Sequence, residues 1–489
     1  MTTLIPKFDF KNGGATPTGA INRPINEKLG DWVSVKDFGA VGDGVADDTV
    51  AIQAAIDYIP NGLVIFPAGT YKISAAIKLK GSILGTGLAT VIQPTADTFA
   101  AFTNNNVGLQ KFSIKGLFIN YGVATGNVQS TNPLSAGFNI TGSVAGEWPF
   151  EFSIDEVWIR YAYYGYKDSS SSYMFTLSNI RVDYAQVGFS LDTNGKTTVN
   201  VTNCFVVIAK QAFYFFGISG LIFDTGGFDL CDNTVGGGNL FYCATCQSVN
   251  LFSVNHEANT IGYEFTSAFA FDACGGVNIN GLRGFQNTFA TGSTEVRGIS
   301  FADGSFGSIS GVTLAGSGEV STGTGAMYAV LLNDSKVTID ACNLTAPAGT
   351  SGTKLALAGT NTSTAVVTKN NNAFVASPLD ATSTIINNQI PLVSTDNGNA
   401  DVNVISGISS PTQLFNTPLS TTRVVYIGTL GLFNGAQFTV VRTSAASGGS
   451  GLQIYDQTAL ALLKTLSAGE FATVTYTGSA WIVTASGSL

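Results

Sequence analysis

The chain has 489 residues, of which 11% are Asp, Glu, Lys or Arg and 45% are hydrophobic. Little charge combined with an ordinary apolar content excludes a disordered chain, and the composition lacks the Ala, Glu, Lys, Leu and Arg bias of a long coiled coil. The formal net charge of −9 argues against nucleic acid as a partner. Neutral polar side chains must cover much of the surface, and these suit carbohydrate hydroxyls, which both donate and accept hydrogen bonds.

The six cysteines and the single histidine offer little metal or redox chemistry. Cys243 and Cys246 form a CxxC pair, but a zinc site wants a second such pair, and the sequence has none. So few cysteines imply buried free thiols rather than a disulfide framework. No apolar run reaches the ~18 residues of a membrane span. We therefore expect no metal, no cofactor and no insertion into a membrane.

The first elements are an arm, a strand and a single helix. Residues 1–35 contain glycines and prolines with little periodicity and indicate an extended arm. A short strand is predicted over 33–40. Asp47-Asp48-Thr49 offers an N-cap, and apolar residues at helical spacing predict a helix over 50–59. Residues 64–71 follow as strand, turn and strand.

A repeat from about residue 109 onward decides the fold class. Its unit is apolar-x-apolar, two residues, then apolar-x-apolar, and a third short strand follows most units. With no intervening helix, this period of ~20–30 residues is typical of a solenoid. We predict an all-β fold, a right-handed parallel β-helix over 36–350. The clearest units begin at Phe152, Phe175, Val199, Leu221, Val249 and Val277.

The repeat fades beyond residue 350. Residues 351–411 are rich in Thr, Asn and Ser and indicate a transition segment. From residue 412 short strands alternate with Gly and Ser turns, which predicts a small antiparallel β-sandwich over 412–489. This last domain would hold subunits together or bind carbohydrate.

One outward column of the repeat carries paired acids. Asp229 and Glu257 occupy the same position of consecutive units, so their backbones should lie ~5 Å apart. Glycoside hydrolysis uses one carboxyl to protonate the leaving oxygen and another to activate water or attack carbon. We predict that this pair is catalytic, with Glu257 as the general acid and Asp229 as nucleophile or base. The two assignments are exchangeable, because coupled carboxyls titrate as a pair.

Other outward residues are candidates for the same face. Glu264 and Asp183 are the next catalytic candidates, with Asp232 and Glu151 behind them. Aromatic rings can stack on sugars and arginines can hold acidic groups, so the predicted substrate-binding residues are Trp158, Arg160, Tyr214 and Arg283.

The register also predicts exposure. Arg160, Asp183, Asp229 and Glu257 should reach solvent, and Phe241 should point outward from its strand. His256 falls at an inward position, where we expect a packed core residue rather than a general base.

The region around the predicted helix carries a motif seen in other β-helices. It consists of Val35-Lys36-Asp37-Phe38-Gly39-Ala40-Val41-Gly42-Asp43-Gly44, then Asp47-Asp48-Thr49, then Phe66-Pro67-Ala68-Gly69-Thr70-Tyr71. It resembles the opening of the pectate-lyase superfamily β-helix, in which the helix caps the open end and protects the first edge from pairing. Together with the preceding arm and the C-terminal domain, it is similar to bacteriophage tailspikes.

The resemblance implies a location and partners. It implies a homotrimer on the virion, attached to a phage tail or baseplate protein through the N-terminal arm. It also implies a bacterial surface polysaccharide as ligand, either a capsule, an O-antigen or an exopolysaccharide.

Three functions remain in competition, because members of such a family share the fold and differ in chemistry. The first is endo-glycosidic hydrolysis of the polysaccharide by paired carboxylates. The second is a polysaccharide lyase, which removes the proton next to a uronate carboxylate and needs a basic residue. The third is a spike that binds its receptor without cleaving it.

Overall fold

The computed structural model divides the chain into two compact units, residues 1–209 and 210–489. Strand β17 (Phe205–Phe216) contains the boundary between them. Much of the predicted arm and parts of the predicted transition segment lie outside the described residues. The structure describes residues 7–8, 21, 23–29, 31–104, 108–142, 148–234, 238–262, 265–290, 295–314, 320–322, 324–344, 348–349, 354–368, 376–379, 382–387, 394, 396–404, 409–428, 436–448 and 450–489.

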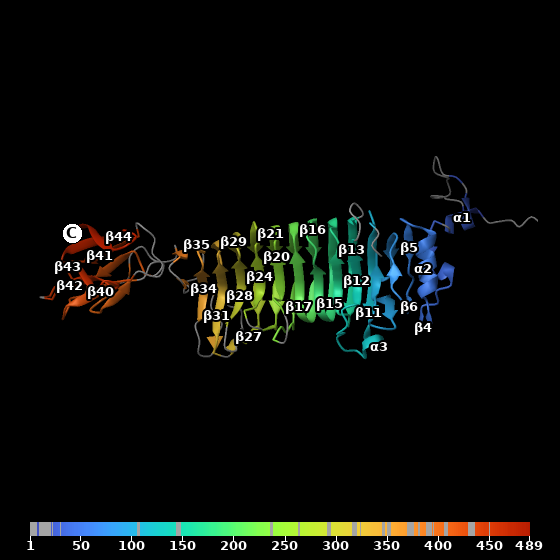
Figure 1. Ribbon diagram of the computed structural model, residues 1–489, viewed down its shortest axis with the longest axis horizontal. Coiled ribbons are helices and arrows are strands. Elements are labelled where there is room, and N and C mark those ends of the chain that lie inside the picture. Colours follow the sequence, from blue (N-terminus) through green and yellow to red (C-terminus); the bar gives the residue numbers. More distant parts are fainter. Residues whose placement is uncertain are drawn as a thin grey trace, which may run out of the picture. The chain divides into compact units, whose positions relative to one another are not determined.

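The first unit is built from stacked parallel strands (Figure 1). Each coil adds one strand to each sheet, so β11 pairs with β13 and β13 with β15, while β12 pairs with β14 and β14 with the end of β15. The alternating apolar residues of these strands point inward and are buried. The strands are β11 (Ser113–Asn120), β12 (Ala136–Thr141), β13 (Phe150–Arg160), β14 (Tyr164–Ser169), β15 (Tyr173–Leu191) and β16 (Lys196–Thr202).

Residues with positive φ turn the chain at the corners of the coils. Glu156, Asn179 and Asn203 have φ of 53°, 53° and 51°. The Asn203 side-chain amide donates to Asn179 Oδ1 at 2.7 Å, and the Asn179 amide donates to Asp155 Oδ1 at 2.7 Å. Asn tolerates this left-handed conformation better than most residues, so one corner is held by a ladder of polar side chains.

A helix closes the N-terminal end of the first unit, as predicted. Helix α2 (Thr49–Tyr58) buries Ile52, Ala55 and Ile56. Asp48 is its N-cap residue, but the Asp48 carboxylate accepts instead from the backbone N–H groups of Val41 and Gly42, at 2.6 and 3.0 Å. The other elements near this end are β1 (Lys7–Phe8), β2 (Arg23–Pro24), α1 (Ile25–Leu29), β3 (Val33–Ser34), β4 (Asp43–Asp47), β5 (Leu63–Ile65), β6 (Gly69–Ile73), β7 (Ile77–Lys78), β8 (Ser82–Leu84), β9 (Thr90–Pro94), β10 (Ala100–Thr103) and α3 (Gly122–Thr125).

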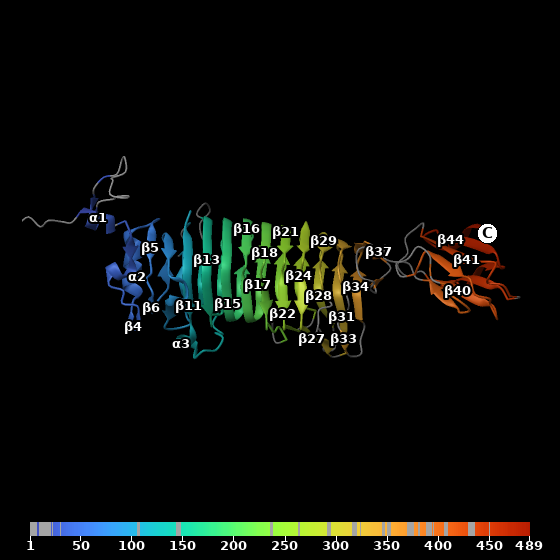
Figure 2. The same cartoon turned by 180° about the vertical axis from the view of Figure 1, so that it is seen from behind.

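The second unit continues the same construction (Figure 2). Its strands stack in parallel as β18–β21–β25–β29–β32, β19–β22–β26 and β20–β24–β28–β31–β34, and β23, β27, β30 and β33 form a separate four-stranded sheet. Their bounds are β18 (Ile218–Asp224), β19 (Gly227–Asp229), β20 (Phe241–Ala244), β21 (Gln247–Phe252), β22 (Asn255–Glu257), β24 (Ser267–Asp272), β25 (Val277–Asn280), β26 (Arg283–Phe285), β28 (Glu295–Ala302), β29 (Phe306–Ser310), β31 (Ala326–Asn333), β32 (Lys336–Asp340) and β34 (Lys354–Thr360). Shorter strands are β23 (Thr260–Ile261), β27 (Thr288–Ala290), β30 (Val320–Thr322), β33 (Ala348–Gly349), β35 (Thr364–Val367), β36 (Ala376–Pro378) and β37 (Thr384–Asn387).

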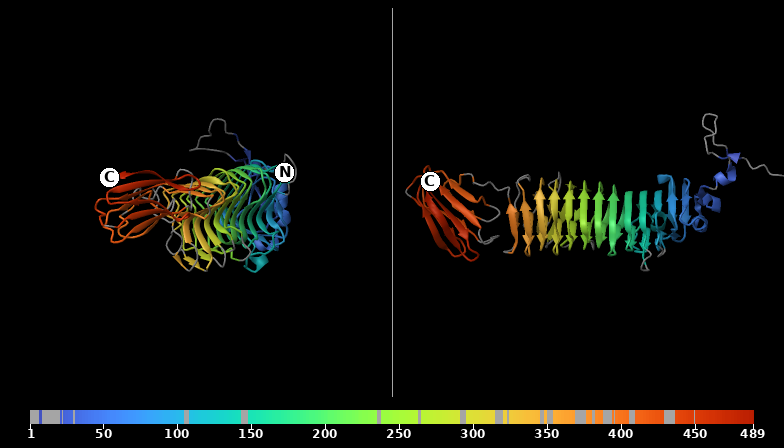
Figure 3. Two further views of the ribbon diagram at one scale, coloured as in Figure 1. Left: turned by 60° about the vertical axis from the view of Figure 1, so that its left-hand side comes forward. Right: turned by 90° about the horizontal axis from the view of Figure 1, so that it is seen from above.

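The C-terminal strands form two four-stranded sheets around their own core (Figure 3). One contains β38 (Val402–Val404), β40 (Arg423–Ile427), β42 (Leu452–Asp456) and β43 (Ala461–Leu466), and the other β39 (Thr412–Phe415), β41 (Gln437–Arg442), β44 (Glu470–Tyr476) and β45 (Trp481–Ser488). The first strands of each sheet pair in parallel and the last in antiparallel fashion. The predicted class, a parallel β-helix with a small C-terminal sandwich, is confirmed, and the sandwich sheets are mixed.

Candidate functional site

The first unit carries an aromatic–arginine platform on the outward face of β11, β13 and β15. We define it as Phe118, Trp158, Arg160, Arg181 and Asp183. Phe118, Trp158 and Arg181 are register partners on the three strands, and Arg160 and Asp183 are partners two residues further along. Parallel pairing stacks these side chains on successive coils. The platform thus arises directly from the repeat.

Asp183 is the centre of this platform and is only 3% exposed. Its carboxylate accepts from Trp158 Nε1 and from Arg181 Nε, both at 2.8 Å, and Arg160 Nε lies 3.9 Å away. The expectation that Asp183 reaches solvent is therefore wrong, because the neighbouring long side chains fold over it. A catalytic role for Asp183 stays a prediction.

The aromatic rings of the platform hold the two guanidinium groups. Trp158 stacks on Phe118 with ring centroids 5.1 Å apart. The Arg160 guanidinium lies 5.4 Å from the Trp158 ring, 4.9 Å from the Tyr161 ring and 5.5 Å from the Tyr184 ring. Cation–π attraction at such distances holds a guanidinium over the ring face. Arg160 thus occupies an aromatic box, and its side chain reaches solvent only in part.

The predicted acid pair lies in the second unit. Asp229 on β19 and Glu257 on β22 are register partners in adjacent parallel strands. Glu257 is exposed and Asp229 is half-buried. The register and the solvent access that we predicted for these two residues are confirmed, and their catalytic roles stay predictions. Arg283 is exposed on β26, two residues before Phe285, which is the register partner of Glu257.

His256 precedes Glu257 on β22 and points into the core, as predicted. Its ring is fully buried and contacts the rings of Phe228 and Phe269, with centroids 5.6 and 5.2 Å away. Burial lowers the pKa of His256 to about 4. A neutral core histidine with no access to solvent is not placed to exchange protons with a substrate.

Tyr214 belongs to a polar cluster that the sequence did not reveal. Tyr214 is the register partner of Tyr242, with ring centroids 5.6 Å apart. The Tyr242 hydroxyl donates to Asp272 Oδ2 at 2.7 Å, and burial raises the pKa of Asp272. The expectation that Phe241 points outward is wrong, because the register of β20 is shifted by one residue and buries Phe241.

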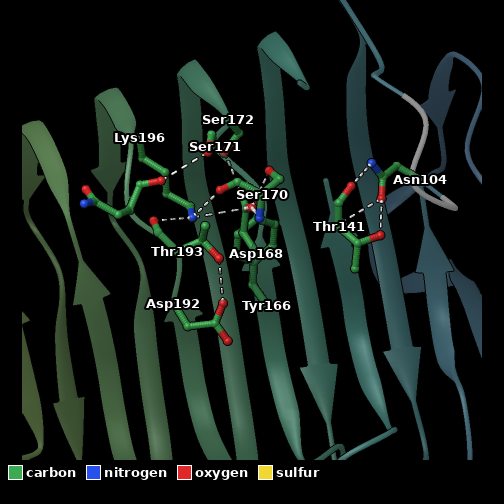
Figure 4. Close-up of polar contacts among 11 residues, drawn as sticks. Asn104, Thr141, Tyr166, Asp168, Ser170, Ser171, Ser172, Asp192, Thr193 and Lys196 are labelled. Carbon is green, nitrogen blue, oxygen red and sulfur yellow. Dashed lines mark hydrogen bonds and ion pairs between the residues drawn. The ribbon is translucent and has the colours of Figure 1, made fainter. Parts of the chain in front are cut away.

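A second missed cluster is a buried ion pair in the first unit (Figure 4). Asp168 and Lys196 are both fully buried, with Lys196 Nζ 3.8 Å from Asp168 Oδ1. The Asp168 carboxylate also accepts from the Ser170 and Ser172 hydroxyls, each at 2.6 Å, and from Tyr166. Burial lowers the pKa of Lys196. This network satisfies its own charges inside the coil, so it supports the fold rather than a substrate.

The remaining candidates are engaged elsewhere or lie outside the described residues. Glu264 falls outside them. Glu151 lies 3.5 Å from Lys111, and Asp232 accepts from the backbone and hydroxyl of Thr234. The six cysteines are free and buried, which confirms the predicted thiols. In the described part of the chain, no helix has the length and apolarity to cross a membrane.

The comparisons with known proteins concern parts of the chain and the fold. Residues 32–131 match the family model "Rhamnogalacturonase A/epimerase, pectate lyase-like". The curated mannuronan C5-epimerase AlgE1 of Azotobacter vinelandii is 29% identical over 233 residues, which cover 40% of this chain and 16% of that protein. Plasmin and fibronectin-binding protein A of Streptococcus pneumoniae is 54% identical over 52 residues, covering 10% of this chain and 7% of that protein. The matches thus span less than a fifth of the length of these two relatives.

A solved structure extends the likeness along the chain. The gp42 tailspike of Acinetobacter phage vb_AbaP_AS12 is 10% identical, with a TM-score of 0.50, and the match covers 94% of this chain and 82% of that one. At this identity the likeness concerns the fold alone. The chain therefore has a pectate-lyase-like segment at residues 32–131 and the parallel β-helix fold that phage tailspikes also adopt.

Proposed function

We propose that this protein binds and depolymerises a bacterial surface polysaccharide by endo-glycosidic hydrolysis. The observation that carries the proposal is the register pairing of Asp229 with Glu257 on the outward side of adjacent strands, where Glu257 reaches solvent. Neighbouring parallel strands lie ~4.8 Å apart, so two carboxyl groups face one glycosidic bond. Most glycoside hydrolases use such a pair of carboxyl groups to cleave the glycosidic bond.

The mechanism assigns one role to each carboxyl group. Glu257 protonates the leaving glycosidic oxygen, and Asp229 attacks the anomeric carbon or activates a water molecule. Arg283, on the strand next to Glu257, is placed to hold a substrate group or to offset the charge of a carboxylate.

The proposal also gives the protein a place and partners. We propose that it is a homotrimeric phage tailspike, joined to the tail or baseplate through residues 1–35. In this proposal, residues 36–350 carry the polysaccharide-binding face, and residues 412–489 hold subunits together or bind carbohydrate. Residues 351–411 are the transition segment between these two domains. The family match at residues 32–131 and the tailspike fold support this reading.

Two alternatives remain. A lyase on the same fold would use a basic residue such as Arg283, and the relative that is named for mannuronan, a polyuronate, keeps this open. A receptor-binding spike without catalysis is the other, and the relative from Streptococcus pneumoniae that is named for binding plasmin and fibronectin favours it.

The deciding experiment incubates the purified chain with capsule, O-antigen and exopolysaccharide preparations and follows polymer size by size-exclusion chromatography. Hydrolysis shortens the polymer and creates reducing ends without ultraviolet absorbance. A lyase shortens it and produces an unsaturated product that absorbs. Unchanged polymer size with retained binding would replace the proposal by the non-catalytic spike.

A further inference from the structure

The exposed end of Arg181 is the part of the platform that has no role yet. Arg181 donates through Nε to Asp183, its guanidinium carbon lies 5.5 Å from the Trp158 ring, and its side chain is 54% exposed. Among the residues that the structure describes, neither of its two terminal nitrogens has an acceptor. Asp183 therefore fixes the guanidinium by one edge and leaves the other edge available next to an aromatic ring.

The charges of the platform do not cancel. Arg160 and Arg181 each carry a positive charge, and Asp183 between them supplies one negative charge. The platform thus keeps one excess positive charge in a chain whose net charge is −9. A polyanion would be repelled by the protein as a whole, so its binding needs a local cation of this kind.

We propose that the platform binds an acidic sugar whose carboxylate lies on the two terminal nitrogens of Arg181. A guanidinium fork and a carboxylate form paired, charge-assisted hydrogen bonds, which are among the strongest in proteins. The inference rests on the proposed function and names its substrate class, a uronate-bearing or otherwise carboxylated polysaccharide. Asp183 is then a positioning residue that aims Arg181 and orients the Trp158 ring.

The test uses an array of bacterial capsular polysaccharides and exopolysaccharides, each printed in native and carboxyl-reduced form. The full chain carries Glu257→Gln so that bound polymer is not cleaved. We expect binding to native acidic polysaccharides and about 10- to 100-fold weaker binding to their reduced forms, the scale of a lost charge-assisted hydrogen bond. Arg181→Gln should abolish this preference, and Arg181→Lys should restore only part of it, because an ammonium lacks the planar fork.

Lys111→Gln is the matched control, since it removes an exposed positive charge of the same unit outside the platform. It should leave the preference for the acidic forms intact. Equal binding of native and reduced polysaccharides, no binding to any acidic polysaccharide, or unchanged binding by Arg181→Gln would each overturn the inference.

Asp183→Asn separates positioning from catalysis. A positioning role predicts a higher KM for the acidic polymer with kcat nearly unchanged. A loss of kcat with unchanged KM would make Asp183 catalytic and refute its positioning role. Failure of the proposed hydrolysis would give a different result from failure of this inference. The polymer would keep its size, while charge-dependent binding through Arg181 would persist.

Discussion

At the scale of single residues, the surroundings of each carboxyl group decide what it can do. Asp183 faces outward in its strand, yet Trp158 and Arg181 bind both of its oxygens and close it off from solvent. Glu257 is on an equivalent outward position and stays exposed. A general acid must reach the leaving oxygen of a substrate, so exposed Glu257 with half-buried Asp229 is the better catalytic pair.

The first prediction concerns this pair. Glu257→Gln and Asp229→Asn should each lower turnover by at least ~100-fold, the scale of a lost general acid or base. Folding and assembly should persist, because both side chains reach solvent. Reducing-end assays give the rate, and circular dichroism checks the fold. Asp224→Asn, an acid-to-amide change at the end of β18, is the matched control and should keep its rate. Near-normal rates in both pair variants would exclude these residues from the mechanism.

The second prediction concerns Trp158. Replacing it with Ala removes the ring that holds Phe118 and Arg181 in place, and a positioned binding surface mainly contributes ground-state affinity. We expect KM to rise by more than kcat falls, measured in steady-state kinetics on the polymer. Unchanged affinity for the polymer would mean that Trp158 is a subunit contact and that the proposed binding face is wrong.

At the scale of elements, the alternation of apolar residues was enough to predict the coils but not their corners. Phe152, Ile154, Val157 and Ile159 are buried as the repeat requires. The shift that turns Tyr242 outward and buries Phe241 could not be predicted, because a shift of one residue exchanges the two faces of a strand.

The polar clusters could not be predicted for a related reason. Asp168 and Lys196 are 28 residues apart in sequence and meet only because successive coils stack. The burial of Asp183 likewise depends on the rotamers of its long neighbours, which a repeat pattern does not contain. The register, by contrast, was enough to bring Asp229 next to Glu257.

The third prediction concerns the coil that contains His256. Its folded-state pKa of about 4 is below the ordinary value of 6.5, so protonation favours the unfolded chain. The contribution of His256 to the free energy of unfolding is fully present above pH 6.5. It falls by about 3 kcal/mol as the pH drops to 4. Urea unfolding at pH 7 and pH 5 should show about 2 kcal/mol of this fall, and His256→Phe should reduce it. An equal loss of stability in both proteins would refute the assignment.

The fourth prediction concerns the corner held by Asp168. Asp168→Ala removes the acceptor of three hydroxyl groups and of a buried ammonium, and should cost about 3–5 kcal/mol. Lys196→Met should cost less, since the three hydroxyl donors still hold Asp168. Lys80→Ala breaks an exposed pair with Asp57 and should change the free energy of unfolding by less than about 1 kcal/mol. Thermal and urea unfolding give the order, and a reversed order of the two buried variants would contradict it.

At the scale of the whole molecule, assembly is the open question. Only 11% of the residues are charged. So few charges give little electrostatic repulsion to keep copies of the chain apart in solution. In the second unit, Ile222, Phe252 and Phe306 are exposed on the sheet of β18, β21 and β29. The acid pair lies on a different sheet, formed by β19 and β22. Exposed apolar residues that lie apart from the candidate site suit a contact between subunits.

The last prediction is therefore that the protein is a homotrimer whose contact includes Ile222, Phe252 and Phe306. Closed symmetry would bury the same face of each copy around a threefold axis. Sedimentation velocity at about 1 µM, a concentration at which a contact of about −8 kcal/mol is half-formed, should give a trimer for the native chain. Ile222→Lys with Phe252→Asp should shift it toward monomer, because each change buries a charge in the contact. Val45→Lys changes an exposed apolar residue in the first unit, and as the control it should leave the trimer intact. A native chain that sediments as a stable monomer would refute the trimer, and a trimer unaffected by the double variant would move the contact to another face.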